Sequence, residues 1–314
     1  MNFIGNTDNS YKNPVCISLF FQPLLAFEWV NSTVQYNSGG SLTSLINPAF
    51  VCLENLILSN NSAKRTSAGV RLVTDSGKLK VRNVSFSRNK GNKGGVIYVS
   101  GASARAQPFS LSISTCNFSF NQGTMQGRGL TIDNFLPLSS DSTISDSKFW
   151  SNSNNQTGAA LFFSCSTGTI EVRNCSFSNN TAKRGSAIYA NYRASFASAA
   201  LLILSDCNFQ NNKGGSVVAF VGASNMPGLN SAQLQFSNNT AISVDMTQGV
   251  WTDRNSSYIG NLAESGEVAR LTPENLITLL NCCVRKNYVR KSSAGLYLTS
   301  GSSAQAMDCQ SVQI

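Results

Sequence analysis

Carboxylates are the first side chains to consider for catalysis, because this sequence of 314 residues contains no histidine. A histidine base and a histidine metal ligand are therefore excluded. Asn6-Thr7-Asp8 is a short acidic fragment, but acid–base hydrolysis needs several carboxylates on one face, and chance explains this match better. Asp146 and Asp206 occupy equivalent places with Asn174 between them, so we expect them to be bend residues. We expect no enzyme, no metal and no cofactor.

The elements that would position such residues come from an internal repeat. Residues 170–192 read IEVRNCSFSNNTAKRGSAIYANY, in which two alternating apolar patterns fall out of phase near Asn174. This predicts two short strands joined by a bend, then a polar turn, then a third strand beginning at Gly185. The sequence holds eleven such segments, each with an aromatic or aliphatic position followed three residues later by Asn. The best-marked pairs are Phe86 and Asn89, Phe118 and Asn121, Phe149 and Asn152, Phe177 and Asn180, and Phe209 and Asn212.

This periodicity predicts an all-β fold, a right-handed parallel β-helix with three short strands per coil, about 28 residues per coil and about eleven coils. We expect one domain over residues 1–314, with the Phe positions stacked inside and the Asn positions forming a ladder that satisfies turn backbone. Residues 243–257 are interpreted as an irregular insertion. Because the repeat is already under way at Phe3 and still running at Cys309, we expect an excerpt of a longer chain that lacks one or both caps.

The nine cysteines lack the Cys-x-x-Cys spacing of metal sites. Five of them share one repeat position, two residues before the Phe position, which should point inward: Cys116, Cys175, Cys207, Cys282 and Cys309. Stacked coils would bring neighbours such as Cys175 and Cys207 close enough for a disulfide. The sequence leaves buried free thiols and partial pairing open.

The charge balance is basic, with 24 Lys and Arg against 15 Asp and Glu, a formal net charge of +9. Several cations fall in the turn after the ladder Asn, where stacked coils would align them along one edge: Lys64, Arg65, Lys93, Lys183, Arg184, Arg290 and Lys291. We call this set the basic edge. It predicts binding of anionic glycans, although ordinary solubilising charge explains the same pattern. Nucleic acid is not an expected partner, and no segment is long and apolar enough to span a membrane.

Asn-x-Ser/Thr sequons occur throughout this Asn- and Ser-rich chain. On a eukaryotic secretory route, the expected acceptors are Asn60, Asn179 and Asn238, because each immediately precedes a ladder Asn in a turn. Asn83 and Asn174 lie at the tight bend and should be poorer acceptors.

The paired motifs Phe-x-x-Asn and Gly-Gly-Ala-Ile resemble the repeats of the chlamydial polymorphic outer membrane proteins. The closest segments contain Phe177, Asn180 and Gly185 to Ile188, followed by Phe86, Asn89 and Gly94 to Ile97. The resemblance implies a pectin-lyase-like β-helix at the cell surface or outside the cell, acting as an adhesin or scaffold toward glycans or molecules of a neighbouring or host cell. The alternative is a polysaccharide-active or polysaccharide-binding protein of the same fold, and a third reading is a structural spacer in a larger protein.

Overall fold

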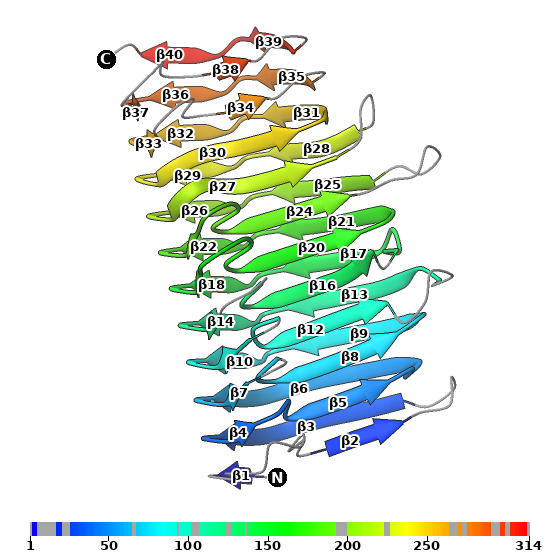
Figure 1. Cartoon of the computed structure of the whole chain (residues 1–314). Helices are drawn as coiled ribbons and strands as arrows, with labels where there is room; N and C mark the ends of the chain where they lie inside the picture. The colour runs from blue at the N-terminus through cyan, green and yellow to red at the C-terminus, as the bar shows by residue number, and fades with distance from the viewer. Residues whose placement is uncertain are drawn as a thin grey trace.

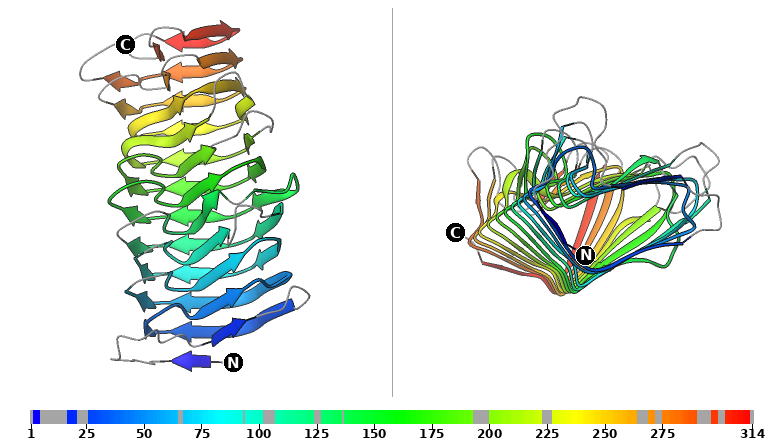
Figure 2. Two further views of the ribbon diagram at one scale, coloured as in Figure 1. Left: turned by 45° about the vertical axis from the view of Figure 1, so that its right-hand side comes forward. Right: turned by 90° about the horizontal axis from the view of Figure 1, so that it is seen from below.

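A computed structural model describes residues 2–4, 17–20, 26–64, 67–92, 94–101, 107–123, 127–135, 137–192, 200–222, 227–263, 269–271, 275–289, 296–298 and 302–312. The regular elements in these ranges are β-strands, and strands of successive coils pair in parallel. Figure 1 shows the coils stacked from the N-terminal end of the rod to the C-terminal end. Viewed along the axis in Figure 2, they share one outline and rotate gradually from coil to coil. The predicted parallel β-helix is therefore confirmed.

The larger sheet contains 21 strands and holds the two strands on either side of the bend. The strands before the bend are β3 (Ala26–Gln35), β6 (Phe50–Ser59), β9 (Gly77–Arg82), β13 (Phe109–Ser114), β17 (Ser142–Ser145), β21 (Gly168–Arg173), β25 (Ala200–Ser205), β28 (Pro227–Ala232), β31 (Gly249–Arg254), β35 (Asn275–Leu280) and β39 (Ser303–Met307). The strands that carry the Phe position are β1 (Asn2–Ile4), β10 (Ser85–Ser87), β14 (Asn117–Ser119), β18 (Lys148–Trp150), β22 (Ser176–Ser178), β26 (Asn208–Gln210), β29 (Gln235–Ser237), β32 (Ser257–Ile259), β36 (Cys283–Arg285) and β40 (Gln310–Val312). Strands β3 and β6 run through the bend and include this position themselves.

The second sheet contains 17 strands and carries the glycine motif. Its longer strands are β2 (Ile17–Phe20), β5 (Thr43–Ile46), β8 (Val70–Thr74), β12 (Ile97–Gly101), β16 (Leu130–Phe135), β20 (Leu161–Cys165), β24 (Ile188–Tyr192), β27 (Lys213–Val221), β30 (Thr240–Thr247), β34 (Ala269–Leu271) and β38 (Leu296–Leu298). Two-residue strands precede them: β4 (Ser38–Gly39), β7 (Ser62–Ala63), β11 (Lys90–Gly91), β15 (Gln122–Gly123), β19 (Ser153–Asn154) and β23 (Thr181–Ala182). Two further short strands, β33 (Leu262–Ala263) and β37 (Tyr288–Val289), pair with each other. These short strands add a fourth strand to a coil for which three were predicted, inside the segment interpreted as a variable turn.

The bend before the Phe strand has the left-handed backbone expected from its residues. Asn174 has φ of 48°, and Asp146 and Asp206 have φ of 52° and 53° at the same place in their coils. Asn and Asp tolerate this conformation because their short polar side chains bond locally. The prediction that Asp146 and Asp206 are bend residues is confirmed.

The Phe positions form one interior column. The ring centroids of Phe118 lie 4.7 Å from Phe86 and 4.8 Å from Phe149, and Phe149 lies 4.9 Å from Phe177. The column continues through Phe209, Phe236 and Tyr258 with planes within 10° of parallel. The spacing equals the distance between adjacent strands, so the backbone stack sets the ring stack.

The ladder asparagines are buried and joined from coil to coil. Asn152 donates from its backbone N–H and from Nδ2 to Oδ1 of Asn180, at 3.0 and 3.1 Å. Its Nδ2 also donates to the Phe118 carbonyl at 3.0 Å, which ties the turn to the Phe strand of the preceding coil. The same pattern links ten ladder asparagines, from Asn37 to Asn287. The predicted ladder is confirmed, because each side chain satisfies backbone groups that would otherwise be buried without partners.

The ladder defines nine full turns between Asn37 and Asn287, with 22 to 32 residues per turn. This spacing agrees with the predicted 28 residues, and the turn count is somewhat lower than the predicted eleven. Residues 243–257 do not form the irregular insertion that was predicted. They form the end of β30, all of β31 and the first residue of β32 in the shortest coil. This coil lacks the glycine motif because β30 runs without a break from Thr240 to Thr247; Gln248 and Gly249, with φ of 61° and 122°, then turn the chain directly into β31.

Candidate functional site

The structure describes only part of the predicted basic edge. Lys64 and Lys183 are exposed in equivalent turns, four coils apart, which corresponds to about 19 Å along the rod. Asn92 and Asn155 occupy the equivalent position in two of the coils between them. Arg65, Lys93, Arg290 and Lys291 lie outside the described residues. In the part of the chain that the structure describes, the predicted edge is therefore two separated lysines and Arg184.

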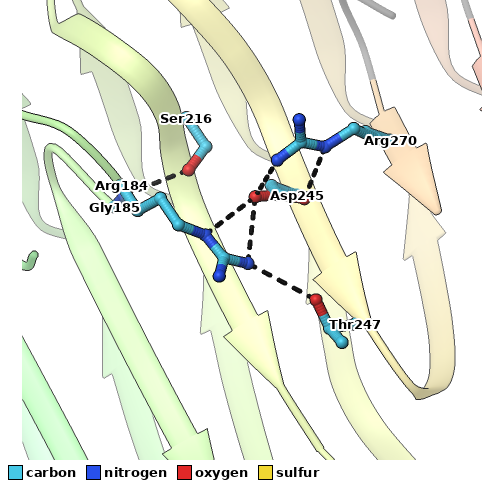
Figure 3. A network of polar contacts seen from close by, with 6 residues as sticks. All are labelled: Arg184, Gly185, Ser216, Asp245, Thr247 and Arg270. Atoms are coloured by element: carbon cyan, nitrogen blue, oxygen red, sulfur yellow. Dashed lines mark hydrogen bonds and ion pairs between the residues drawn. The ribbon is translucent and has the colours of Figure 1, made fainter. Parts of the chain in front are cut away.

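Arg184 does not extend freely from its turn but reaches along the rod to an acidic side chain. Its Nε donates to Oδ2 of Asp245 at 3.1 Å, and its Nη2 lies 3.1 Å from the same oxygen. Nη2 also donates to Oγ1 of Thr247 at 3.4 Å. Figure 3 shows this side chain crossing from its own turn to β30, 61 residues later in the sequence. The turn itself is fixed by a hydrogen bond from the backbone N–H of Gly185 to Oγ of Ser216, 3.0 Å long.

A second arginine completes this cluster from the other side. Arg270 on β34 binds Asp245 in a bidentate manner, with Nε to Oδ1 at 3.0 Å and Nη2 to Oδ2 at 2.7 Å. The Asp245 side chain is 1% exposed, whereas both arginine side chains are 35% exposed. One buried carboxylate thus holds two guanidinium groups at the surface, and the cluster has a net positive charge. The arrangement links the turn before β24 to β30 and β34 across four successive coils, and charge-assisted bidentate geometry makes it stronger than a surface ion pair.

Asp245 belongs to an outward row on the second sheet that the sequence interpretation missed. Register places Tyr98, Thr131, Phe162, Tyr189, Ala219, Asp245 and Arg270 next to one another in successive strands. The rings of Phe162 and Tyr189 stack at 5.3 Å, and the Tyr98 hydroxyl donates to Asp133 at 3.0 Å. Tyr98, Thr131, Phe162 and Tyr189 could have been found as the residue directly after the last apolar residue of the glycine motif, but the coil of Asp245 has no such motif to mark it.

The glycine motif covers four members of this outward row. In four coils the motif begins with a glycine at positive φ, four residues before a member of the row: Gly94, Gly127, Gly158 and Gly185, with φ of 70°, 46°, 63° and 60°. A Cβ added to Gly158 would lie 2.9 Å from Cβ of Phe162, and one added to Gly185 would lie 2.8 Å from Cβ of Tyr189. The turn therefore passes directly over the row, and only glycine lets its backbone come so close.

The acidic side chains do not gather into a hydrolase-like cluster among the described residues. Asp133 and Asp245 are the acidic residues on the described strands of the second sheet, and they lie four coils apart, about 19 Å along the axis. Asp146 bonds to Asn174 Nδ2 at 2.7 Å, and this hydrogen bond is the main cause of a lowered pKa for that carboxyl group. No group of three Cys, Asp or Glu residues suited to a metal ion occurs in the described ranges. Asn6-Thr7-Asp8 lies outside them.

The cysteine column points inward as predicted. Cys116, Cys175, Cys207 and Cys282 are buried, Cys309 is half-buried, and all five are free thiols. Each buried thiol donates to the carbonyl two residues earlier, for example Cys175 to Arg173 at 3.2 Å. Burial raises the pKa of the Cys116 thiol to about 11, so this group is a thiol and not a nucleophilic thiolate at neutral pH.

The predicted glycan acceptors share a backbone conformation with the predicted poor acceptors. Asn179 and Asn238 are exposed and Asn60 is half-buried, with φ between 53° and 55°. Asn83 and Asn174 are also exposed, with φ of 51° and 48°. Backbone geometry does not separate the two sets, so glycosylation at Asn60, Asn179 and Asn238 stays a prediction.

Comparison with known families gives one match, which falls on the best-marked coils. A model described as the Chlamydia polymorphic membrane protein repeat matches residues 83–100 and 174–191. Each match runs from the bend Asn through the Phe strand and the ladder Asn to the strand after the glycine motif, β12 or β24. The chain is a β-helix protein with polymorphic membrane protein-like repeats. No significant match to the chain was found among curated proteins or among solved structures.

The matched polymorphic membrane protein-like repeats share one spacing, which recurs in the coil that contains Asn261 and Gly266. In both, the first motif glycine is the fifth residue after the ladder Asn: Gly94 after Asn89, and Gly185 after Asn180. The match likens these two segments to a repeat that is defined in membrane proteins. Among the described residues, no helix has the length and apolar character needed to cross a bilayer.

Proposed function

We propose that this protein is a non-catalytic adhesin or scaffold, displayed at a cell surface or secreted, whose β-helix holds recognition surfaces at fixed spacing. The observation that carries the proposal is the continuous Asn ladder and aromatic column. Together they make the interior of the rod uniform from coil to coil, while the turns and outer faces vary. Rigid stacks with variable outer residues are typical of recognition proteins.

Anionic surface molecules are the partners that the charge supports. The formal net charge is +9, and the exposed Lys64 and Lys183 stand in turns that project from the stack. Anionic glycans and anionic molecules on a host or neighbouring cell would be attracted to such a rod at low ionic strength, and salt would weaken the attraction.

Adhesion by beads coated with the purified chain tests the proposal directly. We expect such beads to adhere to cells that carry acidic glycans, and to release with increasing salt or after removal of those glycans. The matched control is a bead coated with Lys64→Ser/Lys183→Ser protein, which should adhere more weakly. Arg184 is left unchanged because its loss would disturb the Asp245 cluster. The proposal is refuted if these beads adhere no better than beads coated with an unrelated protein of similar charge.

The polysaccharide-active alternative makes a different prediction. An enzyme would generate new reducing ends or unsaturated ends from a polyuronate, whereas an adhesin would bind the same polymer without shortening it. We expect no change in polymer length after prolonged incubation with the purified chain, with calcium present and absent. If an activity that shortens the polymer copurifies with the protein, the polysaccharide-active alternative replaces the adhesin proposal.

A further inference from the structure

One face of the rod has a composition that differs from the others. It is formed by the outward side chains of the Phe strands, at the positions just before, just after and two after the Phe position; we call it the Phe-strand face. From β6 to β36 these positions contain no Asp or Glu. They hold four cations, Arg88, Lys148, Arg285 and Lys286, among serine, asparagine and glutamine side chains.

An aromatic pair, exposed Phe120 and half-buried Trp150, lies on this face beside two of the cations. The ring centroids of Phe120 and Trp150 are 4.3 Å apart with planes inclined at 64°. The guanidinium carbon of Arg88 lies 5.9 Å from the centre of the Phe120 ring. Lys148 is exposed two residues before Trp150 on the same strand, and its side chain therefore emerges on the same side of the sheet. Three successive coils thus present two aromatic rings and two cations together.

The fold does not account for Phe120. The residue is 38% exposed, and its backbone adopts φ of 54°, a conformation that bulky residues rarely take. Four other coils place asparagine at the same position, namely Asn60, Asn179, Asn211 and Asn238. Tyr36, 58% exposed with φ of 59°, is a second aromatic at this position, two coils before Arg88. Retaining exposed aromatic rings in an unfavourable conformation points to a use outside the core.

We propose that the Phe-strand face binds an acidic polysaccharide, with the cluster of Arg88, Phe120, Lys148 and Trp150 as its centre. Aromatic rings pack against the apolar faces of sugar rings, and the two cations pair with carboxylate or sulfate groups. The surrounding serine and amide side chains donate to and accept from sugar hydroxyls. From Tyr36 to Trp150 the face spans four coil steps, about 19 Å, which accommodates a short oligosaccharide. This inference rests on the proposed adhesive function and names a binding site different from the basic edge.

The test compares three forms of the full chain by titration calorimetry with a polyuronate, a sulfated glycan, neutral dextran and single-stranded DNA. Phe120→Asn/Trp150→Ser replaces both rings with residues found at the same positions in other coils. Leu276→Ser serves as the matched control, because it removes an apolar side chain that is 37% exposed on β35, outside the Phe-strand face. We expect the unchanged chain to bind the acidic polymers but not dextran, and the aromatic variant to bind them about tenfold or more weakly. The control variant should retain most of the affinity.

Folding is checked by thermal unfolding, where the aromatic variant should be at least as stable as the unchanged chain, because asparagine suits the positive φ. Unchanged affinity in the aromatic variant would overturn the inference, as would equal binding of dextran. Absence of glycan binding by the unchanged chain would overturn it too, while bead adhesion separately decides the proposed function. If single-stranded DNA binds more tightly than either acidic polymer, the ligand of the Phe-strand face is a nucleic acid and the inferred polysaccharide is wrong.

Discussion

The Asn ladder gives a quantitative test of what holds the coils together. Asn180 is fully buried, and its Oδ1 accepts two hydrogen bonds from Asn152. Its Nδ2 donates to the Phe149 carbonyl at 2.9 Å and to Oδ1 of Asn212 at 3.1 Å. Asn180→Asp keeps the shape and the accepting oxygen but replaces Nδ2 with an oxygen that faces two acceptors.

The expected cost follows from these four contacts. Losing two buried hydrogen bonds costs about 2 kcal/mol in the free energy of unfolding. An ionised carboxylate held against two oxygens without a cation adds about 2 kcal/mol or more, which gives about 4 kcal/mol at neutral pH. The introduced carboxyl group should have a raised pKa in the folded state. Its electrostatic penalty is therefore absent below about pH 4, the unfolded pKa, and grows as pH rises through the folded pKa.

Urea unfolding followed by tryptophan fluorescence, at neutral pH and near pH 4, measures both quantities if the slope with denaturant is unchanged. Asn208→Asp is the matched control, because Asn208 is half-buried on the outer side of β26 and outside the ladder. We expect the control to change stability by less than about 0.5 kcal/mol. A cost below about 1 kcal/mol for Asn180→Asp, or the same cost at both pH values, would show that the ladder contributes little to coil stacking.

Three further substitutions probe other parts of the rod. Gly158→Ala should lower the free energy of unfolding by about 1–3 kcal/mol in urea, because φ is 63° and the new Cβ would lie 2.7 Å from a carbonyl oxygen. Cys116→Val should remove a pH-dependent contribution of about 3 kcal/mol. Burial raises the Cys116 pKa from 9.0 to about 11. The thiol's contribution to the free energy of unfolding is therefore full below pH 9 and is lost as pH rises through 11. A difference in the free energy of unfolding between variant and parent that stays constant across this range would contradict the reasoning. Asp245→Asn should cost about 2–4 kcal/mol by leaving Arg184 and Arg270 facing each other, and Arg184→Gln in the same background should recover part of the loss in a double-mutant cycle.

The interior of the rod follows from the sequence alone. Phe86, Phe118, Phe149 and Phe177 were assigned to one column because matching positions of a parallel β-helix must lie one strand spacing apart. The same argument predicted the ladder through Asn152 and Asn180. It also predicted the inward cysteine position, because strand alternation fixes which side of the sheet each residue faces.

The outer faces could be predicted only in part. The basic edge assumed that every turn projects in the same way, yet Arg184 folds back toward Asp245 and most of the coils between Lys64 and Lys183 carry no cation there. Residues 243–257 looked irregular because their coil has no glycine motif, although the strands continue through it. Turn length varies between coils, so the number of residues after the ladder Asn does not predict where a turn side chain lies in space.

The sequence by itself determined the coil, its interior column and its hydrogen-bonded ladder, since these depend on positions that recur in register and contact their own equivalents. Tertiary structure alone decided the surface. Arg184 meets Asp245 across 61 residues, and Phe120 meets Trp150 of the next coil, because long side chains cross between coils at the rod's surface. Such contacts join unlike positions of different repeats, and no periodic pattern records them.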